Sequence, residues 1–189
     1  MKKSNSQRLQ QLVLILRRHS LFSRLFAAVY DFAARFFTRK VLAMRLASGA
    51  SPVCTVFVRR GRGRGEDVPG ASDLDFFLVL NELSSQEEMQ FLKDFWIHFR
   101  RWKRFFPFLG ETLMADRNEF VNWHSAPTVR SFESKFSWRW LGGEKISLEA
   151  ATLPALRDVF SECSKCYWAL LKPLLRQERL GFKAYSAEA

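Results

Sequence analysis

Two aspartates stand two residues apart at the start of an apolar run, in the sequence Asp73-Leu-Asp75-Phe-Phe-Leu-Val-Leu80. In a β-strand, residues i and i+2 point to the same face, so both carboxylates would be directed at one place. Two such charges repel each other unless a cation lies between them, and Mg²⁺ or Mn²⁺ prefers oxygen ligands. The spacing therefore suggests a metal site. The plainer interpretation, a polar turn before a buried strand, stays open.

A third carboxylate, Glu111, stands alone in the apolar segment 107–115. Burying a lone acid is costly, so we expect it to have a partner. If a strand at 109–115 lies beside the strand at 73–80, Glu111 approaches the aspartates. Three carboxylates can hold two metal ions for in-line attack on a phosphate. Asp116 competes for this role, but its position directly before Arg117 favours the N-cap of a new helix.

The segment that precedes the aspartates, 59–71, is predicted to be a long loop rich in arginine and glycine. Glycines let backbone amides approach a phosphate closely, and arginines neutralise its charge. A loop of this composition is typical of phosphate binding. Two other interpretations stay open, a disordered segment that binds nucleic acid and a solvated basic loop.

The elements that position these groups follow from the apolar pattern. Strands are predicted at 53–58, 73–80 and 109–115, with the first two forming a hairpin at the centre of a sheet. Ser84 and Glu87 form a capping box that opens a helix to about Phe105, with His98 on its apolar, buried face. The segment 138–146 contains a predicted turn at Gly142-Gly143.

Helices are predicted on either side of this sheet. After 116, short helices break near Pro127, and Pro154 opens a last helix to about Leu180, in which Cys163 and Cys166 are expected to pack in the core. From Ser6 to about Leu46 the spacing is helical, with arginines opposite an apolar stripe formed by Leu21, Leu25, Val29 and Phe32. That segment is a membrane-surface helix or a layer packed on the domain, and the sheet that follows it favours the packed layer.

Composition sets the class of protein. The chain has 189 residues, 48% of them hydrophobic, and a net charge of +11, so general disorder is excluded and anionic partners are favoured: nucleotides, nucleic acid or an acidic membrane face. Its three cysteines form no even framework and no secretory signal is evident, which predicts a cytoplasmic protein. The apolar run 12–16 is too short for a transmembrane segment, and none is expected.

The stretch Val56-Phe-Val-Arg-Arg-Gly-Arg-Gly-Arg-Gly-Glu-Asp-Val-Pro-Gly-Ala-Ser-Asp-Leu-Asp-Phe76 resembles the signature of the nucleotidyltransferase superfamily, the polymerase-beta-like fold. That signature is an apolar strand, a Gly-Ser turn, roughly ten residues, and Asp-x-Asp on the next strand. The segment 106–111 looks like the strand that carries the family's third acid. The resemblance covers about residues 50 to 116.

The resemblance implies a Mg²⁺-dependent enzyme that transfers a nucleoside monophosphate from an NTP, with ATP the first candidate, to an unknown acceptor. It implies an α/β (α+β) fold with a small mixed sheet flanked by helices, divided into an N-terminal helical segment (1–48), a nucleotidyltransferase-like core (49–124) and a C-terminal helical part (125–189). The implied catalytic and metal-binding residues are Asp73, Asp75 and Glu111. The implied nucleotide-binding residues are Arg60, Gly61, Arg62, Arg64 and Ser72.

The chain departs from the family at the Gly-Ser turn, where it has Arg60-Gly61 or Gly61-Arg62 and no serine. In the family this turn holds the triphosphate. An arginine can substitute electrostatically, but its bulk can also block the pocket. Two alternatives therefore stay open, an inactive relative that binds a nucleotide or a protein, and a basic protein that binds nucleic acid or a membrane surface.

Overall fold

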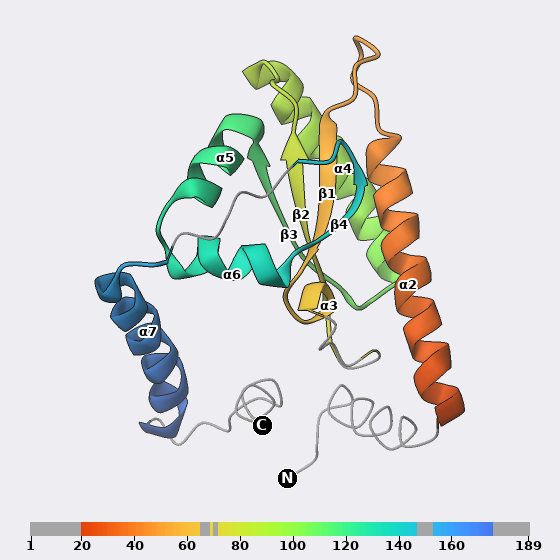
Figure 1. Ribbon diagram of the computed structural model, residues 1–189. Coiled ribbons are helices and arrows are strands. Elements are labelled where there is room, and N and C mark those ends of the chain that lie inside the picture. Colours follow the sequence, from red (N-terminus) through yellow and green to blue (C-terminus); the bar gives the residue numbers. More distant parts are fainter. Residues whose placement is uncertain (1–19, 65–68, 70–71, 147–152, 176–189) are drawn as a thin grey trace.

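A computed structural model shows a four-stranded sheet with helices on both of its faces (Figure 1). It describes residues 20–64, 69, 72–146 and 153–175. The elements in chain order are α2 (Ser20–Leu42), β1 (Val53–Arg59), α3 (Arg60–Arg64), β2 (Leu74–Leu80), α4 (Ser85–Phe105), β3 (Leu109–Asp116), α5 (Arg117–Ser125), α6 (Val129–Ser137), β4 (Arg139–Gly143) and α7 (Leu156–Leu175). The expected mixed α/β fold is confirmed. None of the helices in the described ranges combines the length and apolar character needed to cross a membrane.

The strand order is β3-β2-β1-β4, with β1 antiparallel to both neighbours and β2 parallel to β3. The predicted hairpin of the first two strands at the sheet centre is confirmed, and β2 is buried along its whole length. The predicted turn at Gly142-Gly143 is wrong, because both glycines belong to β4 and pair with β1. Gly143 has φ +90°, and a Cβ on it would lie 2.2 Å from the carbonyl oxygen of Cys54, so this glycine permits close strand approach.

Helices α2 and α4 cover one face of the sheet and contribute to the larger hydrophobic core. Phe37 of α2 stacks on Phe76 of β2 with 4.0 Å between ring centroids. Phe95 of α4 meets the Phe37 ring edge-on, with 6.3 Å between centroids. The capping box of α4 is present, since the Ser84 side chain accepts from the Glu87 N–H and Glu87 accepts from the Ser84 N–H. Each buried aromatic ring contributes about 1.5–3 kcal/mol by leaving water.

The packed layer expected at the N-terminal side is confirmed in α2, but the predicted buried stripe is wrong. Helix α2 packs on the sheet through Tyr30, Phe37 and Val41, which are at most 1% exposed. The predicted stripe faces solvent, and we call it the outer stripe: Leu21, Leu25, Val29 and Phe32. Both sides of α2 carry apolar residues, so helical spacing alone could not tell which side meets the sheet. Residues 6–19 of the predicted helix lie outside the described residues.

The other face of the sheet is covered by α5 and α6, with α7 beyond them (Figure 1). Asp116 is the N-cap of α5, as predicted, because its carboxylate accepts from the Glu119 N–H at 2.8 Å. Pro127 lies between α5 and α6, as predicted. Helix α7 is described to Leu175, and the predicted end near Leu180 lies outside the described residues.

Two predictions of burial on helices are wrong. His98 is exposed at the edge of the buried stripe of α4, where its ring lies over Trp102 with 5.8 Å between centroids. The position lets the imidazole keep its contact with water. Cys163 and Cys166 are also exposed, because α7 meets the rest of the protein mainly at α6.

Candidate active site

The three acids all lie in the region where β1 ends and β2 and β3 begin. Residues Arg59 and Asp75 lie opposite each other in the antiparallel pair β1–β2, so their side chains share one face of the sheet. Strand β3 lies beside β2, in parallel, as required for Glu111 to approach the aspartates. Asp73 stands just before β2 and is exposed, whereas Asp75 is 7% exposed.

A register shift between β2 and β3 brings the backbone of β3 close to the Asp75 side chain. The register passes from Leu74↔Leu109 to Phe76↔Thr112, so one residue of β2 faces two residues of β3, Gly110 and Glu111. This arrangement is a β-bulge, which releases one backbone amide from the strand ladder. The Glu111 N–H donates to Oδ1 of Asp75 at 2.8 Å. A buried carboxylate thus receives a donor from the neighbouring strand.

Gly110 is required by the proximity of the two aspartates. A Cβ on this residue would lie 2.3 Å from Oδ1 of Asp75 and 2.8 Å from Cβ of Asp73. Both distances are shorter than any ordinary van der Waals contact. The structure therefore brings Asp73 and Asp75 to the same stretch of β3 backbone, which a side chain at position 110 would displace.

Arg59 forms an ion pair with Glu111. Its Nη1 lies 3.6 Å from Oε2 of Glu111, and its guanidinium carbon lies 5.3 Å from the centre of the Trp138 ring. The Arg59 side chain is 12% exposed and that of Glu111 is 47% exposed. A guanidinium with so little contact with water is stabilised by a nearby carboxylate and an aromatic face. The sequence analysis did not include Arg59 among the site residues, although Arg59 is the last residue of β1 and lies opposite Asp75.

The candidate nucleotide-binding residues are distributed differently from the prediction. The segment expected to be a loop contains α3, which includes Gly61 and Arg62. Arg62 forms an ion pair and hydrogen bond with Asp31 of α2, and its side chain is 12% exposed, so it fastens α3 to α2. The carbonyl oxygen of Ser72 accepts from the Tyr30 hydroxyl at 2.5 Å, again from α2. The side chains of Arg60 and Arg64 lie outside what the structure describes.

A close approach fixes α3 from its other side. A Cβ on Gly63 would lie 1.7 Å from the carbonyl oxygen of Ser137, at the end of α6. Helix α3 is therefore held between α2 and α6. Within the described ranges, no three side chains of histidine, cysteine, aspartate or glutamate are grouped so that they could hold a metal ion by themselves.

A cavity of about 580 Å³ opens on the same face of the sheet as Arg59 and Asp75. Its walls come from the sheet and from α5, α6 and α7, and they include Arg59, Phe77, Phe120, Trp123, Trp138 and Glu162. We call it the aromatic pocket. Trp123 and Trp138 stack with 5.2 Å between ring centroids, so its wall offers flat apolar surfaces. Its residues come from six elements, which is why no sequence motif predicted it.

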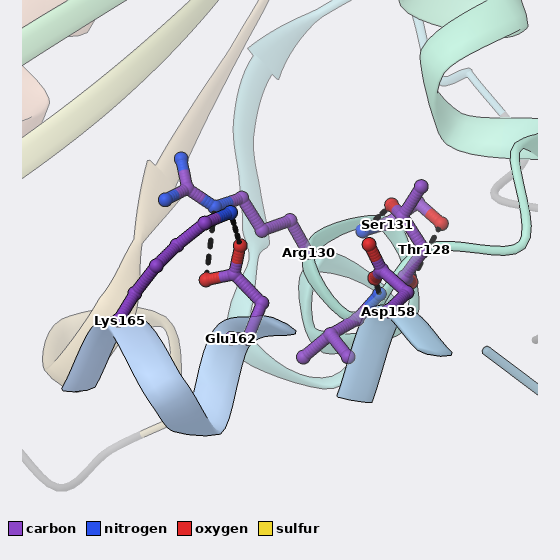
Figure 2. Close-up of polar contacts among 7 residues, drawn as sticks. Thr128, Arg130, Ser131, Asp158, Glu162 and Lys165 are labelled. Carbon is purple, nitrogen blue, oxygen red and sulfur yellow. Dashed lines mark hydrogen bonds and ion pairs between the residues drawn. The ribbon is translucent and has the colours of Figure 1, made fainter. Parts of the chain in front are cut away.

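Polar contacts between α6 and α7 close one side of the aromatic pocket (Figure 2). Oδ2 of Asp158 accepts from the Val129 N–H at 2.7 Å. Glu162 lies 3.6 Å from Nε of Arg130 and accepts from Nζ of Lys165 at 2.5 Å. The Lys165 ammonium holds the pKa of the Glu162 carboxyl below its usual range, with a smaller contribution from Arg130. The Arg130 side chain is 69% exposed, so water screens its ion pair with Glu162, which orients α7 more than it stabilises the fold.

Comparison of the chain with protein-family models, curated proteins and solved structures found no match. What the site can do must therefore be argued from its own residues.

Proposed function

We propose that this protein is a Mg²⁺-dependent nucleotidyltransferase that moves a nucleoside monophosphate from an NTP, with ATP the first candidate, to an acceptor that remains to be identified. One observation carries the proposal. Asp73 and Asp75 share a stretch of backbone that only glycine permits, and Glu111 follows that glycine directly. Paired carboxylates at the start of a strand that follows an apolar strand are what the resemblance to the nucleotidyltransferase superfamily implies.

The residues present suit a magnesium ion. The donors are carboxylate oxygens, and Mg²⁺ is usually bound by one or two carboxylates together with substrate phosphates and water. A group of three protein ligands is therefore not needed before the nucleotide binds. Asp73 and Asp75 are the residues that would hold the ion. When bound, Mg²⁺ supplies positive charge that offsets the charge on the phosphate oxygens in the transition state.

In this proposal, Glu111 acts on the acceptor. Its side chain is about half exposed and belongs to the strand beside Asp75. In the proposed reaction, its carboxylate takes the proton from the acceptor hydroxyl while the acceptor oxygen bonds to the α-phosphorus. The bond from that phosphorus to the bridging oxygen breaks, and pyrophosphate leaves. Arg59 is a positioning residue here, because its guanidinium lies 3.6 Å from the Glu111 carboxylate.

A second function is favoured by one observation. The turn that holds the triphosphate in the superfamily lacks its serine here, and Arg62 of that segment is paired with Asp31. A protein that binds a nucleotide without transferring it would have these features. The two functions are separated by product formation, not by binding.

Calorimetry with Mg²⁺ and ATP, and then with the other NTPs, tests the proposal on the wild type and on Asp73→Asn. We expect metal-dependent binding that weakens roughly tenfold or more in Asp73→Asn, since even indirect partners of metal ligands are worth that much. The matched control is Asp94→Asn, because Asp94 is an aspartate of α4 that accepts from Gln90 away from the site.

Release of pyrophosphate in the presence of candidate acceptors then distinguishes the two functions. Metal-dependent binding without pyrophosphate from any acceptor would support the non-catalytic function. Equal binding by the wild type and Asp73→Asn, or no binding by either protein, would contradict both.

A further inference from the structure

Helix α2 exposes a surface that its packing does not explain. Leu21 is 74% exposed, Leu25 53% and Phe32 61%, and together with Val29 they form the outer stripe. The helix rises about 1.5 Å per residue, so the stripe runs for roughly 16 Å along one side of α2. Isolated exposed apolar residues are ordinary, but a continuous row on the side of a helix opposite its packed face is not.

The charges around the outer stripe have one sign. Exposed basic residues flank it on α2, namely Arg24, Arg35, Arg39 and Lys40. At 100° per residue, Arg24, Arg35 and Arg39 fall on the outward side of the helix with the stripe, not opposite it as the sequence pattern predicted. The one acidic residue of α2, Asp31, is paired with Arg62 of α3.

The end of α4 extends this surface. Phe106 lies 6.1 Å from Phe32 and 5.5 Å from Phe36, ring centre to ring centre, so the two helices meet there. Phe105, its neighbour, is 79% exposed. The last turns of α4 carry exposed basic residues, which we call the basic end of α4: Arg100, Arg101, Lys103 and Arg104. Apolar side chains surrounded by arginine and lysine thus continue from one helix to the other.

We propose that the outer side of α2, together with the basic end of α4, is a docking surface for an anionic membrane. A helix that lies in the membrane interface buries an apolar stripe below the headgroups while its basic residues meet anionic lipids. The outer stripe and its flanking arginines supply both parts, and the net charge of +11 adds long-range attraction. The proposal does not depend on the proposed transferase activity, because no residue of the candidate active site takes part.

Two other occupants match the surface less well. Nucleic acid would use the arginines, but the aliphatic side chains of Leu21, Leu25 and Val29 have no flat face on which bases can stack. A second copy of the chain would bring two sets of arginines together without intervening acids, which costs free energy. A lipid surface accommodates both the apolar row and the positive charge.

The aromatic pocket would stay accessible in the docked protein. Helix α2 covers the face of the sheet opposite to the one on which that pocket opens, and α7 lies on the far side of the sheet from α2 (Figure 1). The control variants can therefore be placed on α7. Leu156 and Phe160 are 76% and 68% exposed there, which matches Leu25 and Phe32 in type and in exposure.

Sedimentation of the full-length protein with vesicles tests the proposal. One set of vesicles is pure phosphatidylcholine, and the other is phosphatidylcholine and phosphatidylserine in equal parts. We expect the wild type to sediment only with the anionic set, and less in high salt as the Debye length shortens. Leu25→Ser with Phe32→Ser should lower the partition coefficient at least tenfold. Arg35→Gln should lower it about fivefold, since each basic residue near such a surface contributes about that factor.

The control pair Leu156→Ser with Phe160→Ser should sediment like the wild type, and all variants should melt at the wild-type temperature because the substituted residues are exposed. The proposal is overturned if the α2 variants bind vesicles as the wild type does. It is also overturned if Leu156→Ser with Phe160→Ser lowers vesicle binding as much as Leu25→Ser with Phe32→Ser does. Binding of DNA but not of vesicles would overturn it too, as would a wild-type dimer that Leu25→Ser with Phe32→Ser converts to a monomer in sedimentation velocity.

Discussion

Replacing Gly110 by alanine tests how closely β3 approaches the two aspartates. The added Cβ would lie 2.3 Å from Oδ1 of Asp75, 2.8 Å from Cβ of Asp73 and 3.2 Å from the carbonyl oxygen of Leu74. The Asp75 carboxylate can turn aside only by giving up the N–H of Glu111, and a hydrogen bond to a charged group is worth about 1.5–3 kcal/mol. If the strands separate instead, overpacking costs about 1–3 kcal/mol.

Alanine also restricts the unfolded chain, which returns about 0.4–1 kcal/mol of stability. With the hydrogen bond lost, the net loss expected for Gly110→Ala is therefore about 0.5–2.6 kcal/mol in the free energy of unfolding. For a domain of this size, that corresponds to a fall of roughly 1–10 °C in the melting temperature. Urea unfolding followed by circular dichroism measures it, provided that the slope with denaturant stays the same as in the wild type.

Gly142→Ala is the matched control, since Gly142 also lies in a strand of the same sheet. Its Cβ would meet only side-chain atoms, Cγ2 of Thr38 at 3.0 Å and Cδ1 of Leu42 at 3.2 Å, which can yield by a few tenths of an ångström. We expect it to cost less than about 1 kcal/mol. A Gly110→Ala protein as stable as Gly142→Ala would refute the close approach of β3 to the aspartates and, with it, the geometry on which the proposed function rests.

Two further predictions concern local chemistry. Ser84→Ala should remove the N-cap of α4 and cost about 1 kcal/mol at neutral pH. Hydrogen bonds from Ser84 lower the pKa of Glu87 in the folded protein, so the stability that they contribute is present above the usual glutamate pKa and is lost as the pH falls through the lowered folded-state pKa. The difference between Ser84→Ala and the wild type in urea unfolding should therefore shrink in acid. With Ellman's reagent, the exposed thiols of Cys163 and Cys166 should react in the native protein, whereas Cys54, whose pKa is raised by burial, should react only after denaturation; rapid reaction of three thiols in the native state would contradict the burial of β1.

The strands and the helix starts were predictable because their signals are local. A capping box needs only Ser84 and Glu87, an N-cap needs only Asp116 before a helix, and the apolar run of β2 is fully buried, as its composition indicated. The sequence did not predict the pairing of β2 with β3, because the two strands are more than thirty residues apart; the approach of Glu111 to the aspartates was therefore predicted only on the assumption that they pair. The β-bulge at Gly110 and Glu111 is a second condition, because in an unbroken register Glu111 would lie opposite Phe76, on the other face of the sheet from Asp75.

What the sequence could not predict depends on contacts between distant segments. Strand β4 was missed because two glycines in succession resemble a turn, and only the neighbouring strand β1 shows why a side chain is excluded at Gly143. The ion pair of Arg62 with Asp31 joins α3 to α2, so the role of that arginine could not be inferred from its glycine-rich neighbourhood. The aromatic pocket likewise combines residues from both halves of the chain.

The two faces of the sheet differ in packing, and this difference separates stability from function. Among the described residues, the face under α2 and α4 holds a core of eighteen buried hydrophobic residues, whereas the face under α5 and α6 holds five and leaves a cavity of about 580 Å³. Cavities forfeit contacts and lower stability, so a fold selected for stability alone would close such a space. A ligand that enters between the sheet and the later helices would recover the missing contacts. The well-packed face then provides most of the folding free energy, and in the proposed function a substrate would bind on the cavity face, which carries Arg59 and Asp75, without disrupting the core.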